Sequence, residues 1–320
     1  MQVTGYTRRL KSFPSAFSRG NGGNPALAGL NRGKAKTFID KTRALCGILT
    51  KLRKRDLVIN RFSSIARMAM LRIDGITKNF GGIQALSSVS FEVAEGSITS
   101  LIGPNGSGKT TLFNCISGVF PPNAGQVSYN GTNITGWAPH HICRIGLGRT
   151  FQNIQLFPNL NVIENVIAAH FCRTRATVLE SILFLPRDRR ERKQTIELAE
   201  ELLEWVGLSE FRFHMPKSLP YGHQRRLEIA RALITQPRLL MLDEPAAGMI
   251  QQEAEELIQL IGRLRKRGHT IFLIEHNMGL VMSISQKVTV LNFGQKIAEG
   301  TPAEVRDNPQ VIEAYLGTER

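Results

Sequence analysis

The sequence lacks any run of eighteen apolar residues, the shortest stretch that normally crosses a bilayer as a helix. With 320 residues, of which 42% are hydrophobic, the chain is long enough to bury a sizeable core. We therefore expect one or two globular domains without a membrane-spanning helix. If the protein acts at a membrane, another chain spans the bilayer.

Cysteine is also scarce. The four cysteines lie far apart in the sequence and show no CxxC spacing: Cys46, Cys115, Cys143 and Cys172. This spacing argues against a zinc site and against a disulfide framework, and it fits a reducing compartment.

Acidic residues are nearly absent from residues 1–67, which hold 15 Lys and Arg against 2 Asp and Glu. Residues 68–320 hold 26 and 24, so the net charge of +15 belongs almost entirely to the N-terminal extension. We interpret the extension as disordered or as a misassigned start, with the biological start at Met68 or Met70. A transit peptide and a nucleic-acid-binding arm are the alternatives. The near-neutral remainder has no excess of basic residues, so no nucleic-acid partner is expected.

Ordered structure is predicted from Met70 onward. The runs LRIDGITKNFGG and SSVSFEVAEG are rich in β-branched and aromatic residues and end in glycine, which predicts an opening antiparallel sheet. The run SITSLI (97–102) predicts a short buried strand, and KTTLFNCISG predicts a helix after it.

Residues 153–235 are predicted to interrupt this core with helices. ELAEELLEWVGL carries apolar residues at 198, 202, 203 and 206, the spacing of an amphipathic helix. The basic run RDRRERK (187–193) is typical of a solvated helix face, and contact with acidic lipid headgroups is the alternative.

Between the predicted strand and helix lies GPNGSGKTT (103–111), which fits the pattern G-x-x-x-x-G-K-[ST]. Glycines let such a loop bring backbone N–H groups close to phosphate oxygens, and the following helix N-terminus adds unpaired donors. Lys109 supplies a positive charge to the β- and γ-phosphates, and Thr110 offers its hydroxyl to Mg²⁺. The pattern arises by chance in roughly one in a hundred chains of this length. The predicted nucleotide-binding loop consists of Gly103, Pro104, Asn105, Gly106, Ser107, Gly108, Lys109, Thr110 and Thr111.

Two further strands end in polar residues. RLLMLDEP (238–245) places Asp243 and Glu244 at the carboxyl end of an apolar strand, where open parallel sheets bind ligands. Asp243 is predicted to hold Mg²⁺ through water, and Glu244 to polarise the water that attacks the γ-phosphate. TIFLIEH (270–276) ends at His276, which could donate a hydrogen bond to the γ-phosphate. Taken alone, His276 is more typical of a solvated strand end.

These residues, in this order, resemble the nucleotide-binding subunit of ABC transporters over roughly residues 70–319. The resemblance implies an α/β fold: a P-loop NTPase core of ABC type with a mixed sheet, an antiparallel β subdomain and an inserted α-helical subdomain at about 153–235. It also implies that Gln152, in RTFQN, is the Q-loop glutamine that contacts metal and attacking water, and that Phe80 stacks on adenine. LPYGHQRRLEIARAL (219–233) resembles the signature segment, which would complete the opposite subunit's ATP site with Tyr221, Gly222 and Gln224.

The segments FNCISG, GRTFQNIQLFPNLNVIENV, IEHNMGLVM and GTPAEVRDNPQVIEAYLG are together similar to the ATP-binding protein of branched-chain amino acid importers. The long segment before the signature is similar to the longer of that importer's two ATPases. The resemblance implies ATP and Mg²⁺ as cofactors and a peripheral place on the cytoplasmic face of the plasma membrane. The implied partners are two transmembrane permeases and a second ATPase subunit, or a second copy of this chain, with a periplasmic binding protein reached indirectly. A groove beside the Q-loop would receive a short permease helix.

Other functions remain open at this point. Import of urea or short amides, and lipopolysaccharide extraction, would keep the same architecture. A soluble nucleic-acid- or ribosome-associated ABC ATPase is the alternative from another class.

Two positions depart from the family pattern. Pro220 takes a signature position that is usually small, and it has neither an N–H nor a hydroxyl to offer the γ-phosphate. Ile250 replaces an asparagine of the loop that bridges the two ATP sites. We therefore expect the site that this chain completes in a partner to be weak, and the site with its own Lys109 and Glu244 to do most of the hydrolysis. A non-hydrolysing regulatory subunit is the alternative, and it rests on these two departures alone.

Overall fold

The computed structural model describes residues 69–174 and 186–316. The predicted extension, residues 1–67, lies outside the described residues. In the described part of the chain, no helix is both long enough and apolar enough to span a bilayer.

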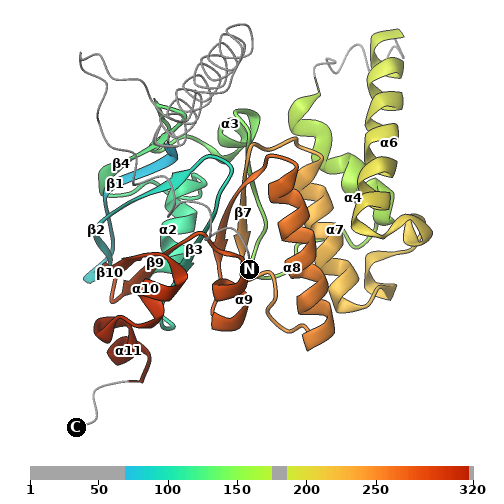
Figure 1. Ribbon diagram of the computed structural model, residues 1–320. Coiled ribbons are helices and arrows are strands. Elements are labelled where there is room, and N and C mark those ends of the chain that lie inside the picture. Colours follow the sequence, from blue (N-terminus) through green and yellow to red (C-terminus); the bar gives the residue numbers. More distant parts are fainter. Residues whose placement is uncertain (1–68, 175–185, 317–320) are drawn as a thin grey trace, which may run out of the picture. The chain divides into compact units, whose positions relative to one another are not determined.

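An antiparallel sheet forms first along the chain (Figure 1), as the sequence predicted. Its strands, in the order β2-β1-β4-β5, are β2 (Ile83–Ala94), β1 (Ala69–Phe80), β4 (Ala124–Tyr129) and β5 (Thr132–Asn133). In β1, Leu71 and Ile73 are buried, whereas the alternate residues Arg72 and Asp74 are exposed, so one face of the sheet is apolar. This face packs on the rest of the core.

The main sheet has six strands, of which five run parallel and one edge strand, β10, pairs antiparallel with its neighbour. In spatial order they are β10 (Gln295–Gly300), β9 (Lys287–Asn292), β3 (Ile98–Ile102), β8 (Thr270–Ile274), β7 (Leu239–Asp243) and β6 (Leu147–Arg149). Every residue of β3, β7 and β8 is buried, as expected for strands covered on both faces.

The register of this sheet assembles the site. Leu101 of β3 lies opposite Ile274 of β8, and Ile274 lies opposite Asp243 of β7. Because the three strands are parallel, the residues that follow them emerge at one edge of the sheet. Three segments are therefore neighbours at this edge: the 103–111 loop, Glu244 and the segment around residue 275.

Helices cover both faces of the main sheet. They are α2 (Lys109–Ile116), α3 (Pro139–Arg144), α8 (Gln251–Lys266), α9 (Met278–Ile284), α10 (Pro302–Arg306) and α11 (Pro309–Leu316). Phe113 of α2 and Phe91 of β2 pack on Phe272, with ring centroids 4.8 and 5.5 Å from it, so α2 is enclosed between the two sheets. Neighbouring residues Ile271 and Leu273 point to the other face, towards α8.

A helical segment follows β6, as predicted, and Figure 1 shows its helices gathered beside the main sheet. It contains α4 (Val162–Ala169), η2 (His170–Arg173), α6 (Pro186–Val206), η3 (Ser209–Phe211), η4 (Pro216–Ser218) and α7 (Tyr221–Leu233). Leu203 and Val206 of α6 are buried, in line with the amphipathic pattern. They belong to the same hydrophobic cluster as Leu240 of β7, so the segment shares its core with the sheet.

Candidate active site

The loop between β3 and α2 is a tight backbone turn in which two glycines are required. Gly103 has a φ of 149°, and a Cβ there would lie 2.1 Å from the carbonyl oxygen of Leu291. Gly108 has a φ of 99°, and its Cβ would lie 2.6 Å from the carbonyl oxygen of Ala85. Both positions therefore exclude side chains, and the loop is packed against neighbouring backbone before any ligand arrives.

Lys109 folds back across this loop. Its Nζ donates to the carbonyl oxygens of Gly103, at 2.8 Å, and Pro104, at 2.9 Å. Burial lowers the pKa of Lys109, and the negative charges of Glu244 and Asp243 oppose that shift. No acidic residue occupies the first turn of α2, so the positive end of the helix dipole adds to the lysine charge. The arrangement suits a polyphosphate.

Asp243 ends β7 with its side chain 1% exposed. Its Oδ2 accepts a hydrogen bond from Arg149 Nη2 at 3.1 Å, whereas its buried Oδ1 has no hydrogen-bond partner in the described chain. Burial raises the pKa of Asp243, and the charge of Arg149 opposes the shift. An unpaired buried carboxylate oxygen is the ligand type that Mg²⁺ prefers, and Thr110 offers a hydroxyl at the exposed start of α2. These residues fit a magnesium ion.

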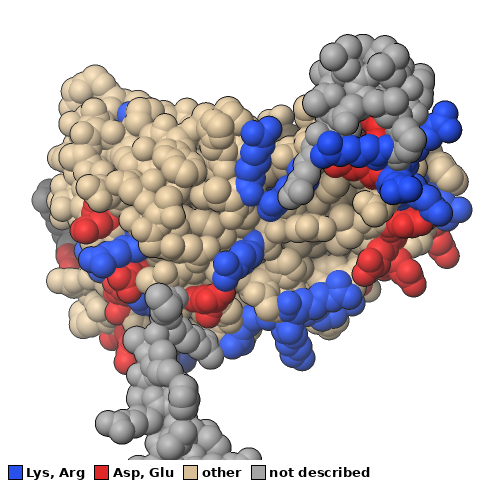
Figure 2. All heavy atoms as spheres, turned by 90° about the horizontal axis from the view of Figure 1, so that it is seen from above, with Lys and Arg blue, Asp and Glu red and all other residues tan. Residues whose placement is uncertain are grey.

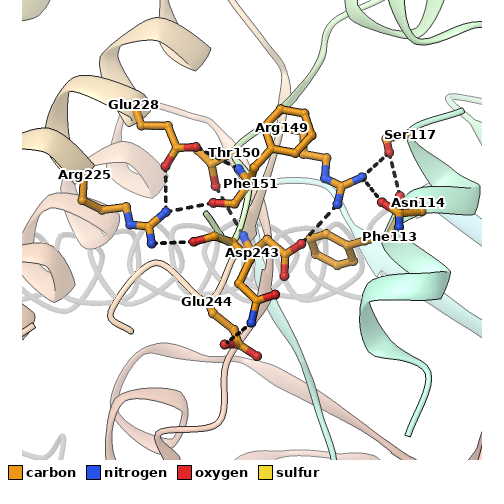
Figure 3. A network of polar contacts seen from close by, with 11 residues as sticks. Phe113, Asn114, Ser117, Arg149, Thr150, Phe151, Arg225, Glu228, Asp243 and Glu244 are labelled. Atoms are coloured by element: carbon orange, nitrogen blue, oxygen red, sulfur yellow. Dashed lines mark hydrogen bonds and ion pairs between the residues drawn. The ribbon is translucent and has the colours of Figure 1, made fainter. Parts of the chain in front are cut away.

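Arg149 is a functional residue that the sequence reasoning missed. Its Nη1 donates to Asn114 Oδ1 at 2.7 Å and to Ser117 Oγ at 2.6 Å, while Nη2 reaches Asp243 (Figure 3). The guanidinium also lies 5.0 Å from the ring centroid of Phe151. Arg149 therefore fixes one oxygen of the carboxylate and ties α2 to the end of β7.

The three predicted catalytic side chains converge. Gln152 Nε2 donates to Glu244 Oε2 at 3.0 Å, and His276 Nδ1 lies 3.7 Å from the same oxygen. Glu244 has a positive φ of 46°, which is uncommon for a residue with a side chain and is typical of strained functional positions. Its N–H donates to the carbonyl oxygen of Ile274 at 3.0 Å, which holds this conformation.

Glu275 is a second residue that the sequence reasoning missed. Its side chain is fully buried. Oε1 accepts from the backbone N–H of Ala246 at 2.9 Å, and Oε2 accepts from those of His276, at 3.1 Å, and Asn277, at 3.3 Å. One carboxylate thus joins the loop after β7 to the loop after β8.

A buried ion pair on α7 holds the backbone around Gln152. Arg225 is completely buried and donates to the carbonyl oxygens of Phe151, at 2.8 Å, and Gln152, at 2.9 Å (Figure 3). It also donates to Glu228 Oε2 at 2.7 Å, and Glu228 Oε1 accepts from the N–H of Phe151 at 3.0 Å. Burial raises the pKa of Glu228, with the Phe151 hydrogen bond and Arg225 opposing. Helix α7 is therefore bonded to the residue that contacts Glu244.

The residues of the signature segment lie at the start of α7. Tyr221 Oη accepts from Arg225 at 3.1 Å, and Gln224 Nε2 donates to the carbonyl oxygen of Leu219 at 2.9 Å. Gly222 is buried. Within the described residues, none of the hydrogen bonds of these three residues reaches the phosphate loop of the same chain. Their role in a partner's ATP site stays a prediction.

Both departures from the family pattern fall at helix N-caps. Pro220 caps α7 and Ile250 caps α8, and neither side chain offers a hydrogen-bond acceptor to the helix. At α8, Glu253 Oε2 still accepts from the N–H of Ile250 at 3.3 Å. Only the return half of a capping box can therefore form there.

Phe80 lies at the end of β1 with 47% of its surface exposed. Its ring makes an edge-to-face contact with Phe120, with the ring centroids 5.3 Å apart. Lys78 Nζ lies 5.2 Å from the centroid of the Phe80 ring. The exposed part of the ring is available to a ligand, and adenine stacking stays a prediction.

A groove with a volume of about 240 Å³ opens between α3, β6 and α7. Its rim carries exposed apolar side chains, with Val119 53% and Phe151 44% exposed. Arg149 and Glu228 also line it. These are the side chains bonded to Asp243 and to the backbone beside Gln152, so an occupant of the groove would touch groups connected to the catalytic residues.

Comparison with known proteins finds relatives that match most of the chain. A family model described as ABC transporter matches residues 86–247, and one described as branched-chain amino acid ATP-binding cassette transporter matches residues 295–320. The chain is 45% identical over 249 residues to the high-affinity branched-chain amino acid transport ATP-binding protein BraF of Pseudomonas aeruginosa, covering 78% of this chain and 98% of that protein. It is 44% identical, with the same coverage, to the protein LivG of Escherichia coli, which carries the same description.

Solved structures show the same architecture. The ADP conformation of MJ1267, an ATP-binding cassette of an ABC transporter, is 33% identical with a TM-score of 0.69, over 78% of this chain and 99% of that one. The dimeric structure of MJ0796, a bacterial ABC transporter cassette, is 26% identical with a TM-score of 0.63, over 73% and 99%.

Proposed function

The chain belongs to the ABC transporter family, and we propose that it is the ATP-hydrolysing subunit of an importer for branched-chain amino acids. The observation that supports hydrolysis is the convergence of Gln152 and His276 on Glu244, beside the phosphate loop. The cargo is inferred from the relatives BraF and LivG and from the family match at the C-terminus.

We derive the chemistry from the residues at the sheet edge. Lys109 and the N-terminus of α2 hold the β- and γ-phosphates of ATP. The Glu244 carboxylate orients and polarises the attacking water, and Gln152 positions that carboxylate. His276 donates a hydrogen bond to the γ-phosphate as charge develops on it. Bound Mg²⁺ supplies positive charge to the phosphates, and the residues that would hold it are Thr110, Gln152 and Asp243.

We propose that the signature segment serves the ATP site of a second ATPase subunit, either a homologue or a second copy. The dimeric cassette MJ0796 supports pairing of such subunits. Because Pro220 has no N–H to offer a γ-phosphate, the site with this chain's own Lys109 and Glu244 should do most of the hydrolysis. Glu244→Gln should then remove most of the ATP turnover of the assembled complex while leaving nucleotide binding in place, because general-base catalysis at this site is lost. Unchanged turnover would refute this assignment.

We propose that the groove beside α3 receives a short helix of a permease. Its exposed Val119 and Phe151 offer an apolar contact, which is the usual basis of helix-in-groove docking. Arg149 and Glu228, which line it, lead by hydrogen bonds to Asp243 and Gln152. Movement of the docked helix would therefore be transmitted through these hydrogen bonds to Asp243 and Gln152 at the ATP site.

The charge pattern of α6 supports a position against a membrane. Its first turns carry the basic run 187–193, and its later turns are rich in glutamate. Basic residues at a helix N-terminus oppose the helix dipole, although Arg192 and Lys193 form ion pairs within the helix, with Asp188 and Glu197. Figure 1 places α3 and the first turns of α6 at the same upper edge, and Figure 2 shows Lys and Arg side chains gathered there beside a few acidic ones. This edge would face anionic lipid headgroups on the cytoplasmic side.

One experiment tests the assembly. The chain is tagged at its C-terminus in its native host, membranes are solubilised gently, and copurifying proteins are identified by mass spectrometry. Two polytopic permeases and a second ATPase would support the proposal. Uptake of labelled leucine, isoleucine and valine, compared with urea and short amides, would then test the cargo. Recovery only from the soluble fraction, with RNA or ribosomal proteins, would overturn the transporter assignment.

A further inference from the structure

Two cysteines that are 29 positions apart in the sequence face each other at the edge of the groove. Cys143 lies in the last turn of α3 and Cys172 lies in η2, and their Sγ atoms are 3.3 Å apart. Both are free thiols with partly exposed side chains. The wide sequence spacing had argued against a disulfide framework, and it gave no sign of this pair.

The fold holds the two cysteines together independently of the sulfur contact. Arg173, which follows Cys172, donates from Nη1 to the carbonyl oxygen of Arg144, which follows Cys143, at 3.0 Å. Its Nε donates to the carbonyl oxygen of Thr235 at 2.7 Å. A single guanidinium therefore fastens η2 to the end of α3 and to the end of α7, and it sets the two thiols opposite each other.

The surroundings prepare one of the thiols to react. The hydrogen bond with Cys172 lowers the pKa of Cys143, and a hydrogen bond from Thr235 and the charges of Arg173 and Arg144 act in the same direction, against burial. The same contact raises the pKa of Cys172, so the pair loses one proton readily and keeps the other. Cys143 also lines the groove, so a small reagent can reach it.

Cys115 shows the opposite environment within the same chain. It belongs to the hydrophobic core between the two sheets and is 2% exposed. Burial raises its pKa to about 11. A thiol of this kind is unreactive, so Cys115 serves as an internal control.

We propose that Cys143 and Cys172 are a site of reversible covalent modification, at which a small disulfide such as oxidised glutathione converts them into an intrachain disulfide. The Cys143 thiolate attacks one sulfur of the reagent, its S–S bond breaks, and one thiolate leaves. Cys172 then loses its proton to solvent and attacks the Cys143 sulfur of the mixed disulfide, releasing the second thiolate. The two cysteines lose two electrons, the reagent becomes two thiols, and these take up the two protons.

The bond would join α3 to η2 covalently at the rim of the groove. Ala169 and Thr235 line the groove next to Cys143, so the crosslink would fix that part of the wall. The proposal does not depend on which molecule the groove receives. It makes the shape of the groove responsive to the thiol–disulfide balance around the protein.

The test uses the full-length reduced chain, incubated with oxidised glutathione, quenched with iodoacetamide, digested with trypsin and analysed by mass spectrometry. No Lys or Arg lies within 110–143 or 150–172, so Cys143 and Cys115 share one tryptic peptide and Cys172 lies on another. We expect these two peptides to be linked in wild type and in Cys115→Ser, unlinked in Cys143→Ser, and separated again by dithiothreitol. A link that persists in Cys143→Ser, or glutathione adducts on Cys143 without any link, would overturn the proposal.

Two further variants test the geometry. Arg173→Ala should slow closure of the mixed disulfide to the intrachain bond at least tenfold, because it releases the contact between η2 and α3. Cys172→Ala should raise the pH at which alkylation of Cys143 is half-maximal, from below the ordinary thiol value of about 8.5 towards it. Unchanged closure in the first variant, or an unchanged midpoint in the second, would refute the positioning argued here.

Discussion

Replacing Arg225 with methionine would test how strongly α7 is bonded to the segment that carries Gln152. The methionine keeps much of the length of the side chain but removes a fully buried guanidinium. The carbonyl oxygens of Phe151 and Gln152 lose their donor, and Glu228 loses its buried counter-charge. Removing one partner of a buried ion pair costs about 3–5 kcal/mol. We expect the free energy of unfolding at pH 8 to fall by that amount, out of the roughly 5–15 kcal/mol of a typical domain.

The pH dependence of this loss identifies Glu228 as its source. Burial already raises the pKa of Glu228 in the folded chain, and loss of Arg225 raises it further. A carboxyl group whose pKa is higher in the folded state stabilises the fold below its unfolded pKa, and this contribution is lost as the pH rises through the folded pKa. Arg225→Met should therefore be less destabilising at pH 5 than at pH 8. Adding Glu228→Gln should remove that difference.

The assay is urea unfolding followed by tryptophan fluorescence. Trp137 and Trp205 are the two tryptophans of the chain, and Trp205 lies in α6, within the helical segment. The reasoning is refuted if Arg225→Met costs less than about 1 kcal/mol at pH 8, a value within the range of ordinary surface substitutions and their scatter. It is also refuted if the double variant is no more stable than the single variant at that pH.

Two further predictions concern backbone geometry. Gly103→Ala should abolish binding of a fluorescent ATP analogue, because its Cβ would lie 2.1 Å from the carbonyl oxygen of Leu291. Gly131→Ala, in the turn between β4 and β5 and outside the phosphate loop, is the matched control: it has a positive φ of 77° but open space around it, so it should cost only about 1–2 kcal/mol of stability and keep binding. Equal loss in both variants would contradict the packing argument. Ile250→Asn should stabilise the chain by about 1 kcal/mol in thermal unfolding, because asparagine can accept from the N–H of Glu253 and complete the cap of α8. An unchanged or lower melting temperature would contradict it.

The parts of the site that could be predicted from the sequence are those whose chemistry is carried by neighbouring residues. The phosphate loop of residues 103–111 is one contiguous pattern between a strand and a helix, so its local structure follows from composition. Asp243 and Glu244 were recognisable because a run of apolar residues leads directly into two carboxylates. The edge of a parallel sheet then brings such strand ends together without any long-range information.

The residues that support the site could not be predicted in this way. Arg149 meets Asp243 across 94 positions, and Arg225 meets Gln152 across 73. A charged residue inside a helix or beside a strand is usually solvated, so nothing local marks these arginines as buried. Glu275 gave one usable signal, since it is a carboxylate directly after the mostly apolar run TIFLI, which forms a fully buried strand.

The Glu275 carboxylate has a consequence for how the site can move. It accepts hydrogen bonds from the N–H groups of Ala246, His276 and Asn277, so one fully buried side chain holds both loops. Neither loop can shift alone without stranding a buried negative charge. Glu244 and His276 should therefore move together as one rigid unit. A single conformational change would then bring both side chains into position for hydrolysis. No state would have only Glu244 or only His276 in place.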